Sequence, residues 1–138
     1  MYNKTNTITR FNSTDSEPIY ISTIHGEIVY YSNRSPKKNT PNEDALAIIP
    51  IDDETIILVV ADGIGGMSKG EEASKIVVQS LISTVANMKS SVRESILDGI
   101  DKANERILNM NVRSGTTVSI AELRQEKVAV FLPLAIAS

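Results

Sequence analysis

The chain has 138 residues, a net charge of −3 and no cysteine, so it can form one globular domain but no disulfide framework. Its charges are spread along the sequence without a basic stripe, which argues against DNA or RNA as a partner. The N-terminus lacks a positively charged start followed by an apolar segment. The longest apolar run, 128–137, is about half the length of a membrane-spanning helix. We therefore expect a cytoplasmic protein that binds neither nucleic acid nor a membrane.

The first 42 residues are predicted to form a tail, a hairpin and a loop. Residues 1–17 are rich in Asn, Thr and Ser and hold few large apolar side chains, so we expect a flexible tail. The β-branched and aromatic runs 19–21 and 28–31 predict two short strands that can pair as a hairpin. Two prolines mark residues 32–42 as a loop.

The rest of the sequence predicts strands, then two helices, then strands. Apolar runs bounded by polar turns indicate the strands, and amphipathic stripes indicate the helices. The predicted strands are 45–51, 55–61, 116–123 and 127–132, and the predicted helices are 68–88 and 91–109. Ser68 with Glu71, and Ser91 with Glu94, form capping boxes at the helix starts. This order favours an α+β fold with helices on one face of an antiparallel sheet.

Acidic residues flank the hairpin predicted from 45–51 and 55–61, at the end opposite its turn. If Asp52-Asp53 is a two-residue turn, counting back along both strands places Glu43 opposite Asp62. A shift of one residue places Asp44 there instead. Either pairing brings like charges together, which a divalent cation would stabilise, and oxygen donors favour Mg²⁺ or Mn²⁺ over zinc. The alternative is that Asn42 and these acids supply only turn and helix-entry chemistry.

A glycine-rich segment, residues 62–71, joins the second of these strands to the first helix. Loops in this position often bind phosphate. The segment lacks the Gly-Lys-Ser/Thr of a Walker A loop, and Ser68 stands where a dinucleotide-binding fold needs glycine, which disfavours nucleotide binding. Its glycines alone also fit a tight turn that packs the helix against the sheet.

Three segments of the chain stand out as motifs: Asn42-Glu43-Asp44-Ala45, the segment from Val60 to Ser74 that contains Asp62-Gly63-Ile64-Gly65-Gly66, and Gly115-Thr116-Thr117-Val118. Together they resemble the motifs of the PPM (PP2C-like) family of metal-dependent protein serine/threonine phosphatases. The resemblance implies an αββα sandwich, of which this chain holds roughly the N-terminal half. It also implies hydrolysis of phosphoserine and phosphothreonine in proteins, opposing a serine/threonine kinase, by a hydroxide that bridges two Mn²⁺ or Mg²⁺ ions.

The same resemblance implies roles for particular residues. Asp62 would bridge the two ions. Glu43 and the Gly63 carbonyl would bind one of them, and Asp44 would hold metal-bound water. The predicted catalytic residues are thus Asp62 and Glu43, and the predicted metal-binding residues are Glu43, Asp44, Asp62 and Gly63.

Two positions depart from the family pattern. The family commonly carries a phosphate-binding arginine three residues before the asparagine of the first motif, where this chain has Asn39. Lys37 and Lys38, with Arg34 nearby, are the candidate phosphate-binding residues in its place, although lysine lacks the fork of arginine and most exposed lysines are simply solvated. Ile64 stands where many eukaryotic members have a histidine, which favours a bacterial-type enzyme.

The sequence stops before the Gly-Asp-Ser segment and the later aspartates that the family uses. We therefore expect residues 18–138 to be a phosphatase domain truncated at its C-terminus. The uncharged ending 128–138 would leave an apolar strand edge unpaired. Two alternatives to an active enzyme stay open: a non-catalytic module that binds a partner through this edge, and an inactive fragment.

Overall fold

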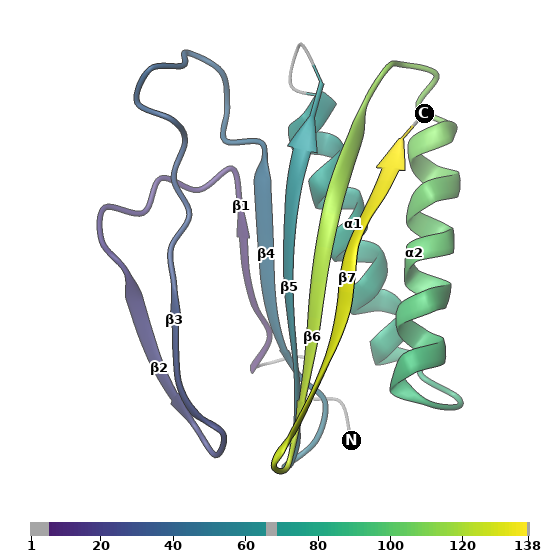
Figure 1. Ribbon diagram of the computed structural model, residues 1–138. Coiled ribbons are helices and arrows are strands. Elements are labelled where there is room, and N and C mark those ends of the chain that lie inside the picture. The colour runs from purple at the N-terminus through teal and green to yellow at the C-terminus, as the bar shows by residue number, and fades with distance from the viewer. Residues whose placement is uncertain (1–5, 66–68, 138) are drawn as a thin grey trace.

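The structure is a computed structural model that describes residues 6–65 and 69–137. Its elements are β1 (Ile8–Phe11), β2 (Ile19–Thr23), β3 (Gly26–Tyr30), β4 (Asp44–Pro50), β5 (Thr55–Ile64), α1 (Lys69–Ala86), α2 (Val92–Leu108), β6 (Gly115–Arg124) and β7 (Lys127–Ala137). Five strands form an antiparallel sheet in the order β1-β4-β5-β6-β7, and β2 and β3 pair separately. Both helices lie on one face of the large sheet (Figure 1). The predicted α+β class is confirmed.

The core lies between the large sheet and the two helices. Because strand residues alternate between faces, every second residue of the central strands points toward the helices. The core includes Ala47, Ile49, Ile57, Val59, Val118 and Ile120 from the sheet and Val77, Leu81, Ile96, Ala103 and Ile107 from the helices. Burying one branched side chain of this kind contributes roughly 1.5–3 kcal/mol. The opposite face is less covered, since Val60, Val128 and Val130 are each more than half exposed.

The strands and helices predicted between residues 19 and 132 are present, with some changes of length. β5 and β7 run beyond their predicted ends, to Ile64 and Ala137, because their pairing with β6 continues along its whole length. At the start of α2, the Ser91 hydroxyl accepts a hydrogen bond from the Glu94 backbone N–H (3.1 Å), as predicted. The cap predicted at Ser68 lies outside the described residues. Neither described helix is long and apolar enough to cross a membrane.

Residues 8–11, part of the flexible tail that we expected over residues 1–17, form a strand, β1. β1 pairs with β4, placing Phe11 opposite Ala45, and Phe11 packs against the core. Residues 1–5 of this stretch lie outside the described part of the chain. The prediction is wrong for β1 because a four-residue edge strand gains its hydrogen bonds and burial from a strand distant in sequence, so its own composition does not reveal it. β1 therefore belongs to the folded domain.

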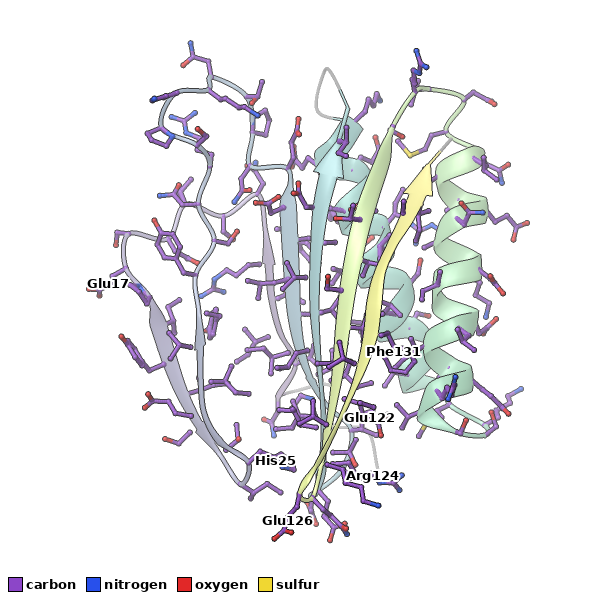
Figure 2. All side chains as sticks on the ribbon, in the orientation of Figure 1. Glu17, His25, Glu122, Arg124, Glu126 and Phe131 are labelled. Carbon is purple, nitrogen blue, oxygen red and sulfur yellow. The ribbon has the colours of Figure 1, made fainter. Side chains whose placement is uncertain are left out.

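The predicted hairpin of β2 and β3 is confirmed, and it contacts the large sheet at both ends. At its tip, His25 Nε2 lies 2.6 Å from the Glu54 carbonyl oxygen, and Nδ1 lies 3.2 Å from the Gln125 carbonyl oxygen (Figure 2). At the far end of β3, the Arg10 guanidinium lies 5.3 Å from the centre of the Tyr30 ring. The hairpin is thus held against the strand turns at one end and against β1 at the other.

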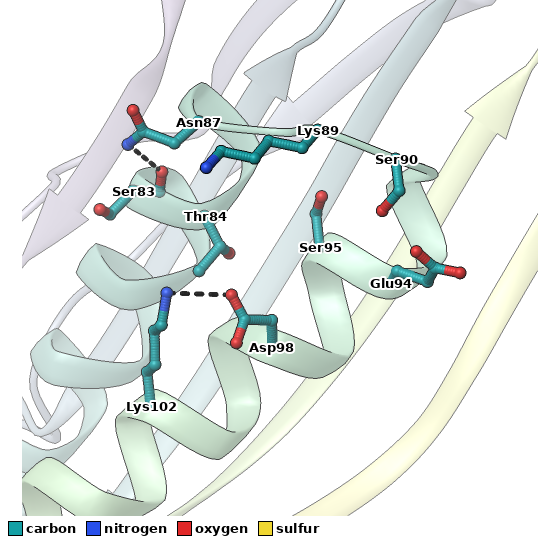
Figure 3. A pocket seen from close by; sticks show the side chains of 9 residues that line it. All are labelled: Ser83, Thr84, Asn87, Lys89, Ser90, Glu94, Ser95, Asp98 and Lys102. Atoms are coloured by element: carbon teal, nitrogen blue, oxygen red, sulfur yellow. Dashed lines mark hydrogen bonds and ion pairs between the residues drawn. The ribbon is translucent and has the colours of Figure 1, made fainter.

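The two helices approach each other closely where Gly99 of α2 faces α1. A Cβ atom at Gly99 would lie 2.7 Å from Thr84 Oγ1. Beyond this contact, a polar cleft of about 510 Å³ opens between the end of α1 and the start of α2, and the Lys102–Asp98 ion pair (3.0 Å) lines it (Figure 3). Since α1 has 18 residues and is about 27 Å long, this cleft lies far from the glycine-rich segment at the other end of the helix.

Candidate functional site

The β4–β5 hairpin brings Asp44 and Asp62 together across neighbouring strands. Its connecting loop has three residues, because the Ile51 N–H donates a hydrogen bond to the Thr55 carbonyl (2.9 Å). The resulting register pairs Asp44 with Asp62. This is one of the two registers that the sequence allowed. The pairing of Glu43 with Asp62, which needs a two-residue turn, is therefore wrong.

The Asp44 carboxyl group holds its proton more tightly than a free aspartic acid. The pKa of Asp44 is raised from 3.8 to about 6. The largest cause is the partial burial of its side chain, followed by the charge of Asp62, a hydrogen bond with Asp62 and the charge of Glu43. The Lys38 ammonium acts in the opposite direction, since it favours the charged carboxylate and lowers this pKa. Carboxylates that repel each other in this way form a favourable place for a cation.

We expect Asp44 to make the metal-free protein less stable as the pH rises from about 4 to about 6. Within this window folded Asp44 keeps a proton that the unfolded chain has released, so a rise in pH favours unfolding. Because the Asp44 side chain is partly exposed and solvent screens its charge, the effect should be only about 1 kcal/mol. Urea unfolding without divalent metal, below and above this window, should show that Asp44→Asn removes this contribution while the exposed control Asp53→Asn does not. An unchanged pH dependence in Asp44→Asn would contradict the expectation.

Two glycines of the second motif, Gly63 in β5 and Gly70 in α1, allow this strand and this helix to pack closely. The carbonyl oxygen of Glu43 accepts hydrogen bonds from the Gly63 N–H (3.1 Å) and from the Ser74 hydroxyl of α1 (2.6 Å). A Cβ atom on Gly63 would collide with the Gly70 carbonyl oxygen, and one on Gly70 would lie 3.0 Å from Glu43 Cδ. These glycines therefore serve close packing, the alternative considered for the glycine-rich segment. They place Glu43 beside the start of α1.

The third motif lies next to the second on the neighbouring strand. Asp62 is paired with Thr117, and Gly63 with Thr116, across β5 and β6. The first motif enters β4 on the other side of β5. Three segments that are far apart in the sequence thus meet at one end of the sheet (Figure 1). Gly66 of the second motif lies outside the described residues.

Asn42 anchors one end of residues 32–42, which we call the site loop. Asn42 is only 3% exposed. Its backbone N–H donates to Asn12 Oδ1 (3.0 Å), and its side-chain amide donates to the Ser13 carbonyl (3.0 Å). The same amide also donates to Ser32 Oγ (2.9 Å). Its Oδ1 accepts from the Asp44 N–H (3.0 Å), which links the loop directly to the acidic pair.

Asp15 anchors the other end of the site loop. Its carboxylate accepts a hydrogen bond from the Ser32 N–H (3.1 Å), and its carbonyl accepts one from Asn33 Nδ2 (3.1 Å). Arg10 of β1 forms an ion pair with this carboxylate at 3.3 Å. Sequence patterns did not predict that Arg10 and Asp15 position the loop, because both lie in the stretch expected to be a tail. A weak signal was Asn12, since asparagine is among the residues that tolerate the positive φ of 47° found there.

A pocket of about 180 Å³ lies between the site loop and the acidic pair. Arg34 and Lys38 line it from the loop, whereas Glu43, Asp44 and Asp62 belong to the ends of the two strands. Lys37, which was predicted together with Lys38 to bind phosphate, is exposed and is not among the residues that line this pocket. The structure thus brings the carboxylates together with one of the two predicted lysines.

The donor atoms at this end of the sheet suit a hard divalent cation. Asp44, Asp62 and Glu43 offer carboxylate oxygens, and Mg²⁺ and Mn²⁺ prefer oxygen ligands. Within residues 6–65 and 69–137, no three His, Cys, Asp or Glu side chains are grouped closely enough to hold a metal ion. The described residues therefore fit part of a coordination shell, which water or other ligands would complete.

Comparison with known proteins assigns the chain to a family. A family model for protein phosphatase 2C matches residues 33–131, which is more than half of the chain and includes all three motifs. No curated protein and no solved structure matches the chain significantly. The chain belongs to the protein phosphatase 2C family.

Proposed function

We propose that this chain hydrolyses phosphoserine and phosphothreonine in proteins with the help of Mn²⁺ or Mg²⁺. The pairing of Asp44 with Asp62 across β4 and β5 carries the proposal, because it creates a cation-attracting site within the family's motifs. Membership in the protein phosphatase 2C family makes a phosphorylated protein the natural substrate. The proposed partner is therefore a protein that a serine/threonine kinase has modified.

The residues of this chain would hold the ions and keep the site rigid. Asp62 and Asp44 are proposed as carboxylate donors on adjacent strands, with Glu43 beside them and the Gly63 carbonyl as a further donor. The two hydrogen bonds to the Glu43 carbonyl oxygen fix the backbone of this residue. When bound, divalent ions of this kind activate water and offset the charge on phosphoryl oxygens.

Hydrolysis of a phosphothreonine peptide by the purified chain, with and without Mn²⁺, tests the proposal. We expect manganese-dependent turnover that Asp62→Ala lowers on the order of 100-fold or more, since even partners outside a metal's ligand set contribute about 10- to 100-fold. Asp53→Ala is the matched control, because it removes an exposed carboxylate from the opposite end of the same hairpin. Calorimetry with Mn²⁺ gives a second readout, in which Asp62→Ala should weaken binding and Asp53→Ala should not.

A folded chain that shows no turnover would overturn the proposed activity and leave the family membership intact. It would favour the second candidate, a non-catalytic module that binds a strand of a partner protein. Val128 and Val130 on β7 are 63% and 66% exposed, and the outer edge of β7 pairs with no described strand. Such an edge can accept a strand from another chain. A non-cooperative thermal transition would instead indicate an inactive fragment.

A further inference from the structure

Two cationic residues of the site loop line the same 180 Å³ pocket as the carboxylates. Arg34 and Lys38 line this pocket, and so do Asp44 and Asp62. Asn39, at the position where the family commonly has its phosphate-binding arginine, does not line it. The positive charge next to the acidic pair therefore comes from other residues of the same loop.

Hydrogen bonds position the backbone of the site loop, which carries these two cationic residues. Its ends are tied to the segment after β1 through Asp15 and Asn42, as described above. Within the loop, the Lys38 N–H donates a hydrogen bond to the Ser35 carbonyl (3.1 Å), which closes a turn. This turn directly follows Arg34, so both cations belong to one compact unit.

We infer that Arg34 and Lys38 form a clamp that binds the phosphoryl group of the substrate next to Asp44 and Asp62, an inference that rests on the proposed function. A guanidinium can donate to two phosphoryl oxygens at once, and an ammonium adds a point charge. The pocket has the volume of roughly six water molecules at about 30 Å³ each, which admits a phosphoryl group with a few waters. Lys37 adds charge to the loop without lining the pocket.

Binding measured without divalent metal and without turnover tests the clamp. A phosphothreonine peptide, its unphosphorylated form and inorganic phosphate would each be titrated into the chain, with the amide NMR signals of residues 32–42 as the readout. We expect saturable shifts with both phosphate-bearing ligands and none with the unphosphorylated peptide. Arg34→Ala and Lys38→Ala should each weaken binding roughly threefold to tenfold, as expected for hydrogen bonds to a charged group. Lys37→Ala, the matched control, should change it less than about twofold.

Asp62→Asn tests the clamp through a substitution that should strengthen phosphate binding, whereas Arg34→Ala and Lys38→Ala should weaken it. Removing a negative charge beside the pocket should strengthen metal-free phosphate binding, because the carboxylates repel the phosphoryl dianion. If Lys37→Ala weakens binding as much as Lys38→Ala, the loop acts only through diffuse charge, and the clamp is wrong. Unchanged binding in Arg34→Ala and Lys38→Ala would make these cations mere counter-ions of the carboxylates and would also overturn it.

The clamp and the proposed phosphatase activity can fail separately. Clamp-dependent phosphate binding in a chain that shows no manganese-dependent hydrolysis would reject the catalytic activity and retain the clamp. Manganese-dependent hydrolysis with phosphate binding that ignores Arg34 and Lys38 would reject the clamp and retain the activity. A higher affinity for the peptide than for inorganic phosphate identifies the clamped group as substrate, as inferred, whereas the reverse order would assign the clamp to the product and contradict the inference.

Discussion

Gly63→Ala should destabilise the protein by about 3 kcal/mol or more, because the end of β5 has no space for a side chain. The new Cβ would collide with the Gly70 carbonyl oxygen and lie 2.6 Å from the Glu43 carbonyl oxygen. Both obstacles are backbone atoms, which cannot rotate away as a flexible side chain can. Gly63 does not adopt a positive φ, so the cost is steric and not conformational. Urea unfolding of the metal-free protein would measure it.

Two neighbouring substitutions serve as controls for this result. Ile64→Ala removes a side chain that is 64% exposed and should change the free energy of unfolding by less than about 1 kcal/mol. Gly70→Ala should have an intermediate effect, since its Cβ would lie 2.9 Å from the nearest backbone atom. A Gly63→Ala protein as stable as the wild type would show that β5 and α1 do not approach each other as described.

Asn42→Ala should cost about 2–4 kcal/mol and loosen the site loop. The substitution removes the partners of the Asp44 N–H, the Ser32 hydroxyl and the Ser13 carbonyl. Leaving a buried polar group unpaired costs about 1–3 kcal/mol. The bond to Ser32 is buried, and the bonds to Ser13 and Asp44 are partly buried, so their loss adds to this cost. Hydrogen exchange at the Asp44 amide should become faster, and the phosphate affinity attributed to Arg34 and Lys38 should fall with it.

Asn39→Ala is the matched comparison for Asn42→Ala. It deletes the same side chain from the same loop at an exposed position, so it should change stability by less than about 0.5 kcal/mol. Equal effects of the two substitutions, or normal exchange at the Asp44 amide in Asn42→Ala, would show that Asn42 does not anchor the loop.

Local patterns in the sequence were sufficient to predict most elements. The helical stripes and the Ser91 cap placed α2 within a residue or so, because these signals depend on side chains three or four positions apart. The three motifs marked the acidic site, and the family match confirms that this resemblance was correct. The strand register remained open because it depends on one turn. That turn contains a local bond from the Glu54 N–H to Asp52 Oδ1 (2.8 Å), which fits the three-residue loop.

By itself, the sequence determined the α+β class, the order of the elements from residue 19 onward and the family, since each of these follows from composition, periodicity or short motifs. Only the tertiary structure decided that Asp44 faces Asp62, that β1 joins the sheet, and that Asp15 and Asn42 anchor the site loop. It also separated Lys38, which lines the pocket, from the adjacent Lys37, which does not. The physical reason is that these features rest on hydrogen bonds and contacts between distant residues, which no local pattern specifies.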